Sequence, residues 1–479
     1  MRRAALPLLL SLLVPGGVAP GGAGQTTAPP APTAAWGDSL YPTLGQAGLD
    51  VQHYDLALTV PTPGTPTLSA NVTLTAHATR DLPLLSLDFT GPAVTRATWN
   101  GQSLPFTHDR ARGKLLLRRA LPRGAATTVT LHYQGEPQGL PDPVLPLRVG
   151  WQSVPGAAGA PGANFAFSEP DGTRSFLPVN DHPADPATFT VHLTVPQALT
   201  AVASGVQTSD HPAPGQRHTV TFEQRQPIPT YALALHVGPL ERVTVPPAPA
   251  APGRTVTRAD YFPPGVPDTV RAPYRRTNEM LRTLQDWFGP YPFETLGAVV
   301  VTPALPALET ATLSTMPVRS STDRVVVHEL AHQWFGNAVP LADWADVWLN
   351  EGFATYAELL WAQAQGQDGQ SVANTWYEQL RARGTRPLVA RTQEEMFDLS
   401  AYQRGALALH ALRAQVGDPA FRGFLRAYAA ARTARPTRTA DLLRLTRTRL
   451  GDAAERTLRE WIEQPELPPR PEVLGGPVH

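Results

Sequence analysis

The sequence contains no cysteine, a single lysine and no apolar run long enough to cross a bilayer. Without cysteine there are no disulfides and no lipobox site for a lipid anchor, so this chain of 479 residues must be held together by its cores. Lys114 is the one lysine, and nearly all of the positive charge is arginine. Forty basic and forty acidic residues cancel, which gives no electrostatic reason to expect a nucleic-acid partner.

The N-terminus has the pattern of a secretory signal peptide. A basic MRR precedes the short apolar run AALPLLLSLLV, and small residues follow. We expect residues 1–24 to be cleaved near Ala23 to Gln25, and the protein to be exported, periplasmic or extracellular, without a membrane anchor. An apolar N-terminus that stays attached is the alternative. Residues 25–44 are rich in Pro and Ala, which predicts a flexible leader.

Alternating apolar and polar residues are typical of 45–245. The run VQHYDLALTV begins this pattern, and five similar runs follow it between Gly- and Pro-rich turns, at 70–79, 82–91, 127–135, 187–196 and 218–224. A period of two predicts an N-terminal antiparallel all-β domain. The segment VTVPPAPAAPGRT at 243–255 indicates a linker and therefore a domain boundary near residue 245.

Beyond this boundary the apolar period becomes helical. The pattern predicts a short strand at 297–303 and helices at 269–289, 351–365, 402–417, 419–432 and 439–451. We therefore expect an α+β multidomain protein, with the β domain at 45–245, a mainly helical domain at 246–468 and a tail at 469–479.

HELAH at 328–332 places His328 and His332 one helical turn apart on one face, with Ser321 and Thr322 as caps upstream. That spacing suits two ligands of a tetrahedral zinc ion. Glu329 lies beside them and can reach a water in an open coordination position. For this motif alone, a pair of hydrogen-bonded core histidines is the alternative interpretation.

Glu351 decides between these interpretations. It follows His332 after eighteen residues and opens a second helix, with Asn350 as the predicted N-cap. An antiparallel return would bring its carboxylate to the two imidazoles. Two histidines and one glutamate form the ligand set of a catalytic zinc ion, because they leave one position for water. We predict one zinc ion in a hydrolytic centre, and Asp346 as a partner that orients a ligand histidine.

HELAHQWFGN, eighteen intervening residues and then NEG together resemble peptidase family M1, a family of zinc aminopeptidases among the gluzincins. FSEPDGTRSFLPVNDHP, WFGPYPFETLGAVVV and the closing WIEQPELP are similar to further landmarks of that family in the same order. The resemblance covers roughly 45–468 and implies a thermolysin-like zinc peptidase domain. Many members continue into a helical C-terminal domain. We expect this chain to be a short form without that domain. Such a form implies a more open active-site cleft, in a monomer or a homodimer.

The resemblance implies three more site residues. Tyr402 in AYQRG matches a tyrosine that stabilises the oxyanion, although a tyrosine before such a helix is by itself more often core. Glu309 in PALET matches the glutamate that binds the substrate's α-ammonium group, with neighbours that depart from the family pattern. Glu169 in FSEPDG matches a second substrate-binding carboxylate, and Phe167 replaces a glutamine there.

These residues predict an exported zinc aminopeptidase that acts on peptides with a free N-terminus. Glu329 would serve as general base and then as general acid. A zinc endopeptidase of thermolysin type would use the same metal site without needing Glu309 or Glu169. A non-catalytic M1-like peptide-binding protein is the third hypothesis.

Overall fold

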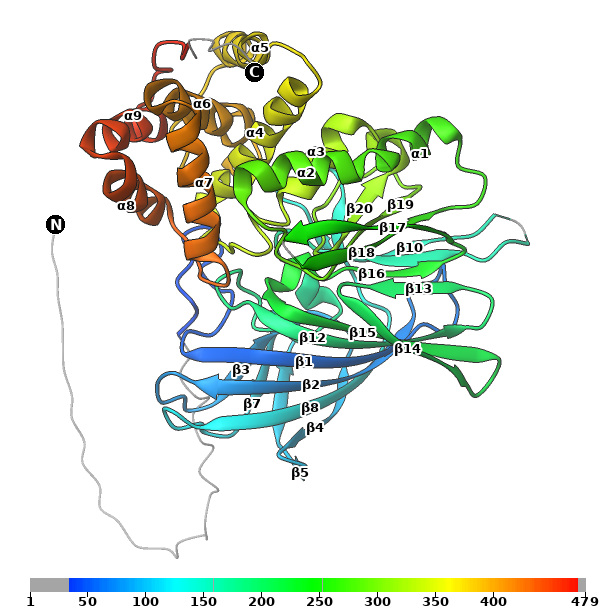
Figure 1. Cartoon of the computed structure of the whole chain (residues 1–479). Helices are drawn as coiled ribbons and strands as arrows, with labels where there is room; N and C mark the ends of the chain where they lie inside the picture. The colour runs from blue at the N-terminus through cyan, green and yellow to red at the C-terminus, as the bar shows by residue number, and fades with distance from the viewer. Residues whose placement is uncertain (1–33, 158, 252, 473–479) are drawn as a thin grey trace, which may run out of the picture. The chain divides into compact units, whose positions relative to one another are not determined.

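The computed structural model describes residues 34–157, 159–251 and 253–472, and its N-terminal half is built from β-sheets (Figure 1). The largest sheet has eight strands in the order β14-β15-β12-β1-β2-β8-β4-β5. These strands are β1 (Leu49–Thr59), β2 (Leu68–Ala78), β4 (Val94–Trp99), β5 (Gln102–Ser103), β8 (Ala126–Gly135), β12 (Ala187–Pro196), β14 (Val206–Ala213) and β15 (Arg217–Ile228). Burial alternates along β1 and β12, as the period of two requires.

The prediction of a purely antiparallel domain is wrong at one pair of strands. β1 and β12 run parallel, with Tyr54 opposite Phe189. β12 comes back to β1 through a long crossover rather than a hairpin, and only such a connection can place two strands in parallel. The strand period in the sequence carries no information about this pairing.

Two smaller sheets complete the β domain. One has the order β13-β16-β11-β10-β9 and the other β3-β7-β6. Their strands are β3 (Leu85–Asp88), β6 (Phe106–Asp109), β7 (Lys114–Leu117), β9 (Leu140–Pro141), β10 (Arg148–Val154), β11 (Ala163–Phe167), β13 (Thr200–Ala203) and β16 (Leu235–Gly238). The chain leaves β11 directly into Ser168 and Glu169, so this sheet fixes the position of one predicted site residue.

The predicted linker at 243–255 is wrong. β17 (Glu241–Ala251) and β18 (Arg254–Phe262) form a hairpin there, and they continue into β19 (Thr295–Val301) and β20 (Leu313–Pro317) as one sheet. β17 is the edge strand, where missing N–H groups cost no ladder hydrogen bond, so its prolines are tolerated. The boundary predicted near residue 245 therefore falls inside a strand.

Helices α1, α2 and α3 lie beside the sheet β17–β20, and the other helices extend away from it (Figure 1). The nine α-helices of the described residues are α1 (Asp268–Arg275), α2 (Thr277–Phe288), α3 (Asp323–Ala331), α4 (Trp348–Ala364), α5 (Gly369–Arg383), α6 (Gly405–Val416), α7 (Asp418–Arg432), α8 (Thr439–Leu450) and α9 (Asp452–Glu463). The helix predicted at 269–289 is interrupted at Arg276, whose N–H turns to the Pro273 carbonyl. The sequence patterns did not predict α5 or α9.

Residues 36–44 pack into the protein, so the prediction of a flexible leader is wrong over this stretch. Leu40, Tyr41 and Leu44 are buried, and Asp38 is hydrogen-bonded to Trp344 of the helical half. The predicted signal peptide, the first part of the predicted leader and the end of the predicted tail lie outside the described residues.

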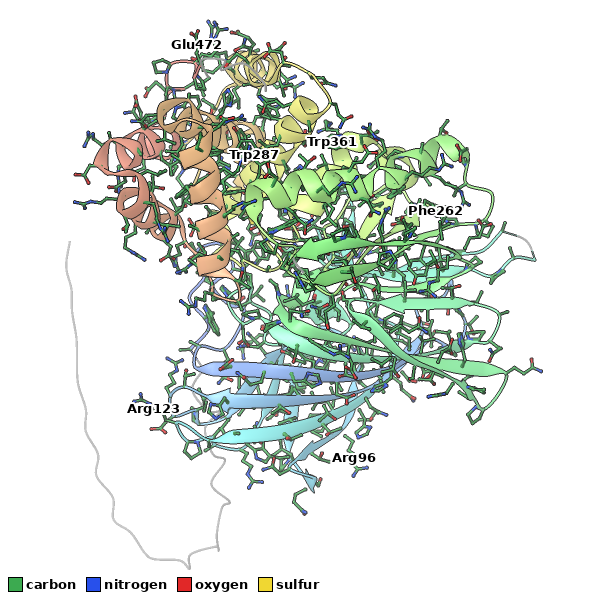
Figure 2. All side chains as sticks on the ribbon, in the orientation of Figure 1. Arg96, Arg123, Phe262, Trp287, Trp361 and Glu472 are labelled. Atoms are coloured by element: carbon green, nitrogen blue, oxygen red, sulfur yellow. The ribbon has the colours of Figure 1, made fainter. Side chains whose placement is uncertain are left out.

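Side chains divide as expected between surface and core. Arg96 and Arg123 project from strands and turns of the β domain, whereas Trp287 and Trp361 lie among the helices (Figure 2). Within the described ranges, no helix combines the length and the apolar character that crossing a bilayer requires.

Two glycines bring the candidate site together. A π-helical turn at Ser400–Arg404 carries Tyr402 into α6, and Gly405 at its end meets Gly352 of α4. A Cβ atom on Gly352 would lie 2.9 Å from the Gly405 Cα atom, closer than packed atoms allow. The absence of both side chains lets the helix that carries Glu351 approach the turn that carries Tyr402.

We predict that Gly352→Ala lowers the free energy of unfolding by about 1–3 kcal/mol, because two backbones must move apart. Chemical denaturation of the variant and the wild type measures the difference. Gly423→Ala on α7 is the matched control, because an added methyl group there meets no atom within 4 Å. Equal destabilisation by both variants would contradict the close contact.

Candidate metal centre and active site

The helix α3 presents the HELAH motif to the interior. Thr322 is its N-cap, as predicted, and its side chain accepts a hydrogen bond from the Val325 N–H at 3.3 Å. His328 lies in the last turn of the helix, and His332 follows directly after its end in a helical conformation. Both histidines are buried. The local sequence therefore places both imidazoles on one face.

Glu351 lies in the first turn of α4, but Asn350 is not the N-cap. The helix starts at Trp348, because a 3-10 turn at Trp344–Asp346 runs almost directly into it. Asn350 instead donates from its side-chain amide to the Tyr231 hydroxyl at 3.3 Å. The helix start is thus earlier than predicted, and Glu351 still faces α3.

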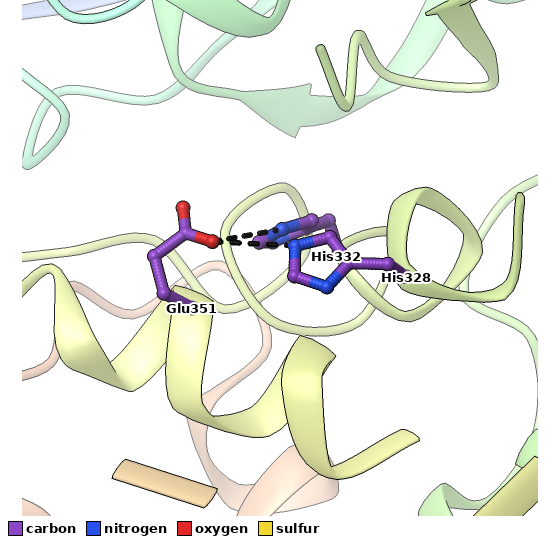
Figure 3. A group of neighbouring side chains, drawn as sticks. All are labelled: His328, His332 and Glu351. Carbon is purple, nitrogen blue, oxygen red and sulfur yellow. Dashed lines mark hydrogen bonds and ion pairs between the residues drawn. The ribbon is translucent and has the colours of Figure 1, made fainter. Parts of the chain in front are cut away.

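The three predicted metal ligands converge on one point (Figure 3). The Glu351 Oε2 atom lies 3.3 Å from His328 Nε2 and 3.6 Å from His332 Nε2. Ligand atoms 2.0–2.1 Å from a tetrahedral zinc ion are about 3.3–3.4 Å apart. Two imidazoles and a carboxylate at these separations fit zinc in both chemistry and spacing.

The outer ring nitrogens fix the orientation of both histidines. His328 Nδ1 lies 2.9 Å from Glu358 Oε1, and His332 Nδ1 lies 3.0 Å from the Phe335 carbonyl oxygen. These oxygens can only accept, so each Nδ1 carries the hydrogen and each Nε2 is left to bind metal. The prediction that Asp346 orients a ligand histidine is wrong, because its carboxylate accepts from Thr439.

Carboxylates dominate the electrostatics of the site. Burial alone would lower the pKa of His332, but Glu309 and Glu351 outweigh it and raise that pKa to about 9. Burial likewise opposes protonation of His328, yet hydrogen bonds to Glu351 and Glu358 raise its pKa well above the usual value. Without a metal ion, both imidazoles are therefore favoured in their positively charged form at neutral pH.

Glu329 lies beside the ligands and is poised to exchange a proton. Its carboxylate, that of Glu309 and a ring nitrogen of His332 all lie within 4.8 Å of one another. Burial raises the pKa of Glu329 to about 7, with Glu309 and Glu351 acting in the same direction against the two histidines. A pKa near the working pH is what a general base requires.

Glu309 and Glu169 reach the site from different halves of the molecule. Glu309 is buried, and its carboxylate accepts from the Tyr231 hydroxyl at 3.2 Å, while Asn337 donates to its backbone carbonyl at 2.7 Å. Glu169 has a buried carboxylate oxygen without a hydrogen-bond partner among the described residues. Burial raises the pKa of Glu169 well above its usual value, and the charges of Glu309 and Glu351 raise it further.

Tyr402 lies against the metal-binding group. Its ring stacks on the His328 imidazole, with centroids 6.0 Å apart. Burial raises the pKa of its hydroxyl, and the charge of Glu351 adds to this effect, so the group stays a hydrogen-bond donor. The structure thus gathers six of the seven predicted residues into one group, and the seventh, Glu169, is linked to them by its electrostatic interaction with Glu309 and Glu351.

Sequence reasoning missed three residues that support them. Glu358 follows Glu351 by seven positions, which is two turns of the same helix face, so the sequence did contain a signal for it. Asn337 closes the HELAHQWFGN run, but no spacing indicated its contact with Glu309. Tyr231 comes from the β domain, and nothing in the sequence indicated that it contacts the site.

A buried group of two histidines and a glutamate, with a second glutamate inside HExxH, defines a zinc metallopeptidase of the gluzincin type. The chain belongs to peptidase family M1. The model of the peptidase M1 N-terminal domain matches residues 51–232, and that of the peptidase family M1 domain matches 268–461.

Solved structures and curated relatives agree with this. The M1 zinc metallopeptidase from Deinococcus radiodurans has 52% identity and a TM-score of 0.87, over 92% of this chain and all of that one. A glutamate-to-alanine mutant of that enzyme has been solved with a Tyr-Ser-Ala substrate. Aminopeptidase N from Streptomyces lividans is 30% identical over 62% of this chain, and leukotriene A-4 hydrolase from Xenopus laevis 27% over 61%. The chain spans 37% and 48% of those two proteins.

We predict that Glu358→Ala lowers zinc affinity by about 10- to 100-fold, because His328 loses the partner that orients it. Competition between the protein and a zinc chelator measures the change. Glu378→Ala is the matched control, since that exposed glutamate pairs, within the described ranges, with Arg381 of its own helix alone. An affinity that stays at the wild-type value in Glu358→Ala would contradict the role given to this carboxylate.

Zinc affinity should also decrease as the pH is lowered. Both ligand histidines have raised pKa values, and that of His332 is about 9, so towards lower pH the ion must displace their protons. Displacement of two protons weakens binding by up to about 100-fold per pH unit as the pH falls from 8 to 6. Chelator competition at several pH values measures this slope, and a flat profile would show that the imidazoles are not protonated.

Proposed function

We propose that the protein is a zinc-dependent aminopeptidase that releases N-terminal residues from peptides. The observation that carries this proposal is the Glu309 carboxylate within 4.8 Å of the Glu329 carboxylate and a His332 ring nitrogen, with Glu169 from the β domain interacting electrostatically with Glu309. The name of aminopeptidase N from Streptomyces lividans and the Tyr-Ser-Ala complex of the Deinococcus radiodurans enzyme support the same activity.

The residues around the metal have complementary tasks in this proposal. Zinc, held by His328, His332 and Glu351, supplies Lewis acidity and lowers the pKa of a bound water. Glu329 accepts the proton of the attacking water and passes it to the departing amine. The Tyr402 hydroxyl donates to the oxyanion that forms at the scissile carbonyl.

Glu309 and Glu169 set which peptide bond is cut. A free α-ammonium group between two buried carboxylates gains charge-assisted hydrogen bonds and offsets their mutual repulsion. The first peptide bond of the substrate then lies next to the metal. An acetylated N-terminus has no positive charge and leaves both carboxylates uncompensated.

The two other hypotheses fit the site less well. A zinc endopeptidase would place a neutral stretch of peptide against Glu309 and Glu169, and buried carboxylates without a cation are costly. A non-catalytic binding protein has no use for Glu329 with its pKa near 7 or for Tyr402 on the His328 ring.

We further propose a single zinc ion, export of the protein and a monomer or homodimer. A second carboxylate group, Glu309 with Glu329, could hold metal only by sharing His332 with the first, which favours one ion. The basic and apolar N-terminal sequence supports export to the periplasm or the medium.

A peptide panel tests the proposed function. Peptides with free and with N-acetylated termini are incubated with the zinc-loaded protein, with and without a chelator. We expect cleavage of the free peptides alone, its loss with chelator and its return with added zinc. Equal cleavage of acetylated peptides would favour the endopeptidase, and binding without cleavage would favour the binding protein.

Glu329→Gln should retain zinc but lose at least about 100-fold in kcat, because the general base is removed while the ligands stay in place. Zinc content by elemental analysis and turnover of a free peptide are measured on the same sample. Glu279→Gln on the surface of α2 is the control and should keep full activity. Turnover near the wild-type rate in Glu329→Gln would refute the role of the base.

A further inference from the structure

Tyr402 depends on its own turn for its position. Its hydroxyl has no hydrogen-bond partner among the described residues, and its ring lies against the His328 imidazole with centroids 6.0 Å apart. The turn that carries it, Ser400–Arg404, is π-helical, and such wide turns are frequent at functional sites. The contacts that hold this turn therefore determine where the Tyr402 hydroxyl lies.

Arg404 ends this turn, and its side chain is buried. A guanidinium group has five N–H donors and no acceptor. The donors of Arg404 meet five oxygen atoms, all from residues outside the turn. These are the Thr385 hydroxyl at 3.2 Å and the carbonyls of Trp461 at 2.8 Å, Gln464, Pro465 at 3.4 Å and Glu466 at 3.3 Å.

The charge of Arg404 is satisfied by main-chain carbonyls instead of a carboxylate. Burial lowers the pKa of its guanidinium to about 10, so the group is still a cation at neutral pH. A buried cation without hydrogen-bond partners would be costly. The stretch 461–466 gathers four carbonyls around it, so this stretch and the π-helical turn hold each other in place.

The stretch after α9 is itself fixed to the helical half. The Leu388 N–H donates to the Ile462 carbonyl at 2.8 Å. The Tyr377 hydroxyl of α5 donates to the Pro468 carbonyl at 2.9 Å. Arg404 is thus bound to a segment that has its own anchors on both sides.

Thr385 connects Arg404 to the other end of the turn. Its hydroxyl, which accepts from Arg404, lies 3.4 Å from the hydroxyl of Ser400, the first residue of the turn. The next residue, Arg386, donates its N–H to the same Ser400 hydroxyl at 3.2 Å. Both ends of the turn that carries Tyr402 are therefore held at one place.

We propose that Arg404 is a positioning residue for Tyr402. By binding the carbonyls of 461–466 it holds the π-helical turn where the Tyr402 hydroxyl can donate to the oxyanion. This inference rests on the proposed function, in which Tyr402 stabilises that oxyanion. It makes the stretch that follows α9 a part of the support of the active site.

A double-mutant cycle with Arg404→Met and Tyr402→Phe tests this inference. Loss of one oxyanion donor costs about 100- to 1000-fold in kcat, and a displaced donor costs less. We expect Arg404→Met to lower kcat by about 10- to 100-fold with KM changed by less than about twofold. In protein that already carries Tyr402→Phe, the same substitution should change kcat by less than about twofold. An equal loss in both backgrounds would overturn the proposal.

Two further variants keep the test decisive if Arg404→Met does not fold. Arg404→Lys keeps the charge and three donors, so its kcat should lie between those of the wild type and the methionine variant. Thr385→Val keeps the size of the side chain and removes one contact of Arg404. It should lower kcat by about two- to tenfold, and only while Tyr402 is present. Wild-type kcat in both variants would also overturn the proposal.

Arg413→Met is the matched control. Arg413 is a second buried arginine near the other end of α6, where it pairs with Asp418 at 2.7 Å. Its loss should lower the free energy of unfolding, measured by chemical denaturation, while kcat of the folded protein stays at the wild-type value.

Binding without turnover separates this inference from the proposed function. A phosphinic dipeptide analogue carries tetrahedral oxygens like those of the oxyanion, whereas alaninamide has none. In calorimetry with zinc-loaded protein, Arg404→Met should weaken the phosphinic analogue by about tenfold or more and leave alaninamide unchanged. Equal weakening of both ligands would contradict a role through Tyr402. Missing peptidase activity in the wild type would count against the proposed function alone.

Discussion

The Glu351 carboxylate faces the two buried imidazoles of His328 and His332. The helices of the helical half are packed so that these three side chains come together. Charged and polar groups can be buried only when they satisfy one another, so α3 and α4 must meet face to face. Glu358 fixes one imidazole from two turns further along α4. Next to Glu351 in α4, Gly352 against Gly405 admits the turn with Tyr402.

The site also concentrates negative charge. Burial raises the pKa of Glu169, Glu309 and Glu329, and the charge of Glu351 raises each of them further. Protons or cations relieve the repulsion in such a cluster, and in the proposed function these cations are the zinc ion and the substrate's ammonium group. In the proposed function, the repulsion between the carboxylates thus contributes to the affinity for metal and for a free N-terminus. Neither half of the molecule supplies all four carboxylates.

The sequence was most informative where function is local. HELAH, its cap Thr322 and the distance to Glu351 predicted the metal-binding group, because helix geometry converts spacing directly into position. The period of two likewise predicted strands of the β domain.

Prediction failed where tertiary context decides. Composition alone made 243–255 a linker and 36–44 a leader, whereas one is an edge hairpin and the other is held by Asp38. The helices α5 and α9 were not predicted, because only narrow apolar stripes of them are buried. The contact of Tyr231 with Glu309 was not predicted either, because 78 positions separate the two residues in the sequence.

The most direct test of cleavage from the amino end follows the products of a single peptide of about ten residues by mass spectrometry over time, with the zinc-loaded protein. We expect a ladder of products that shorten by one residue from the amino end, because in the proposed function Glu309 and Glu169 hold the free amine beside the metal. The appearance of internal fragments before any single-residue loss would contradict it.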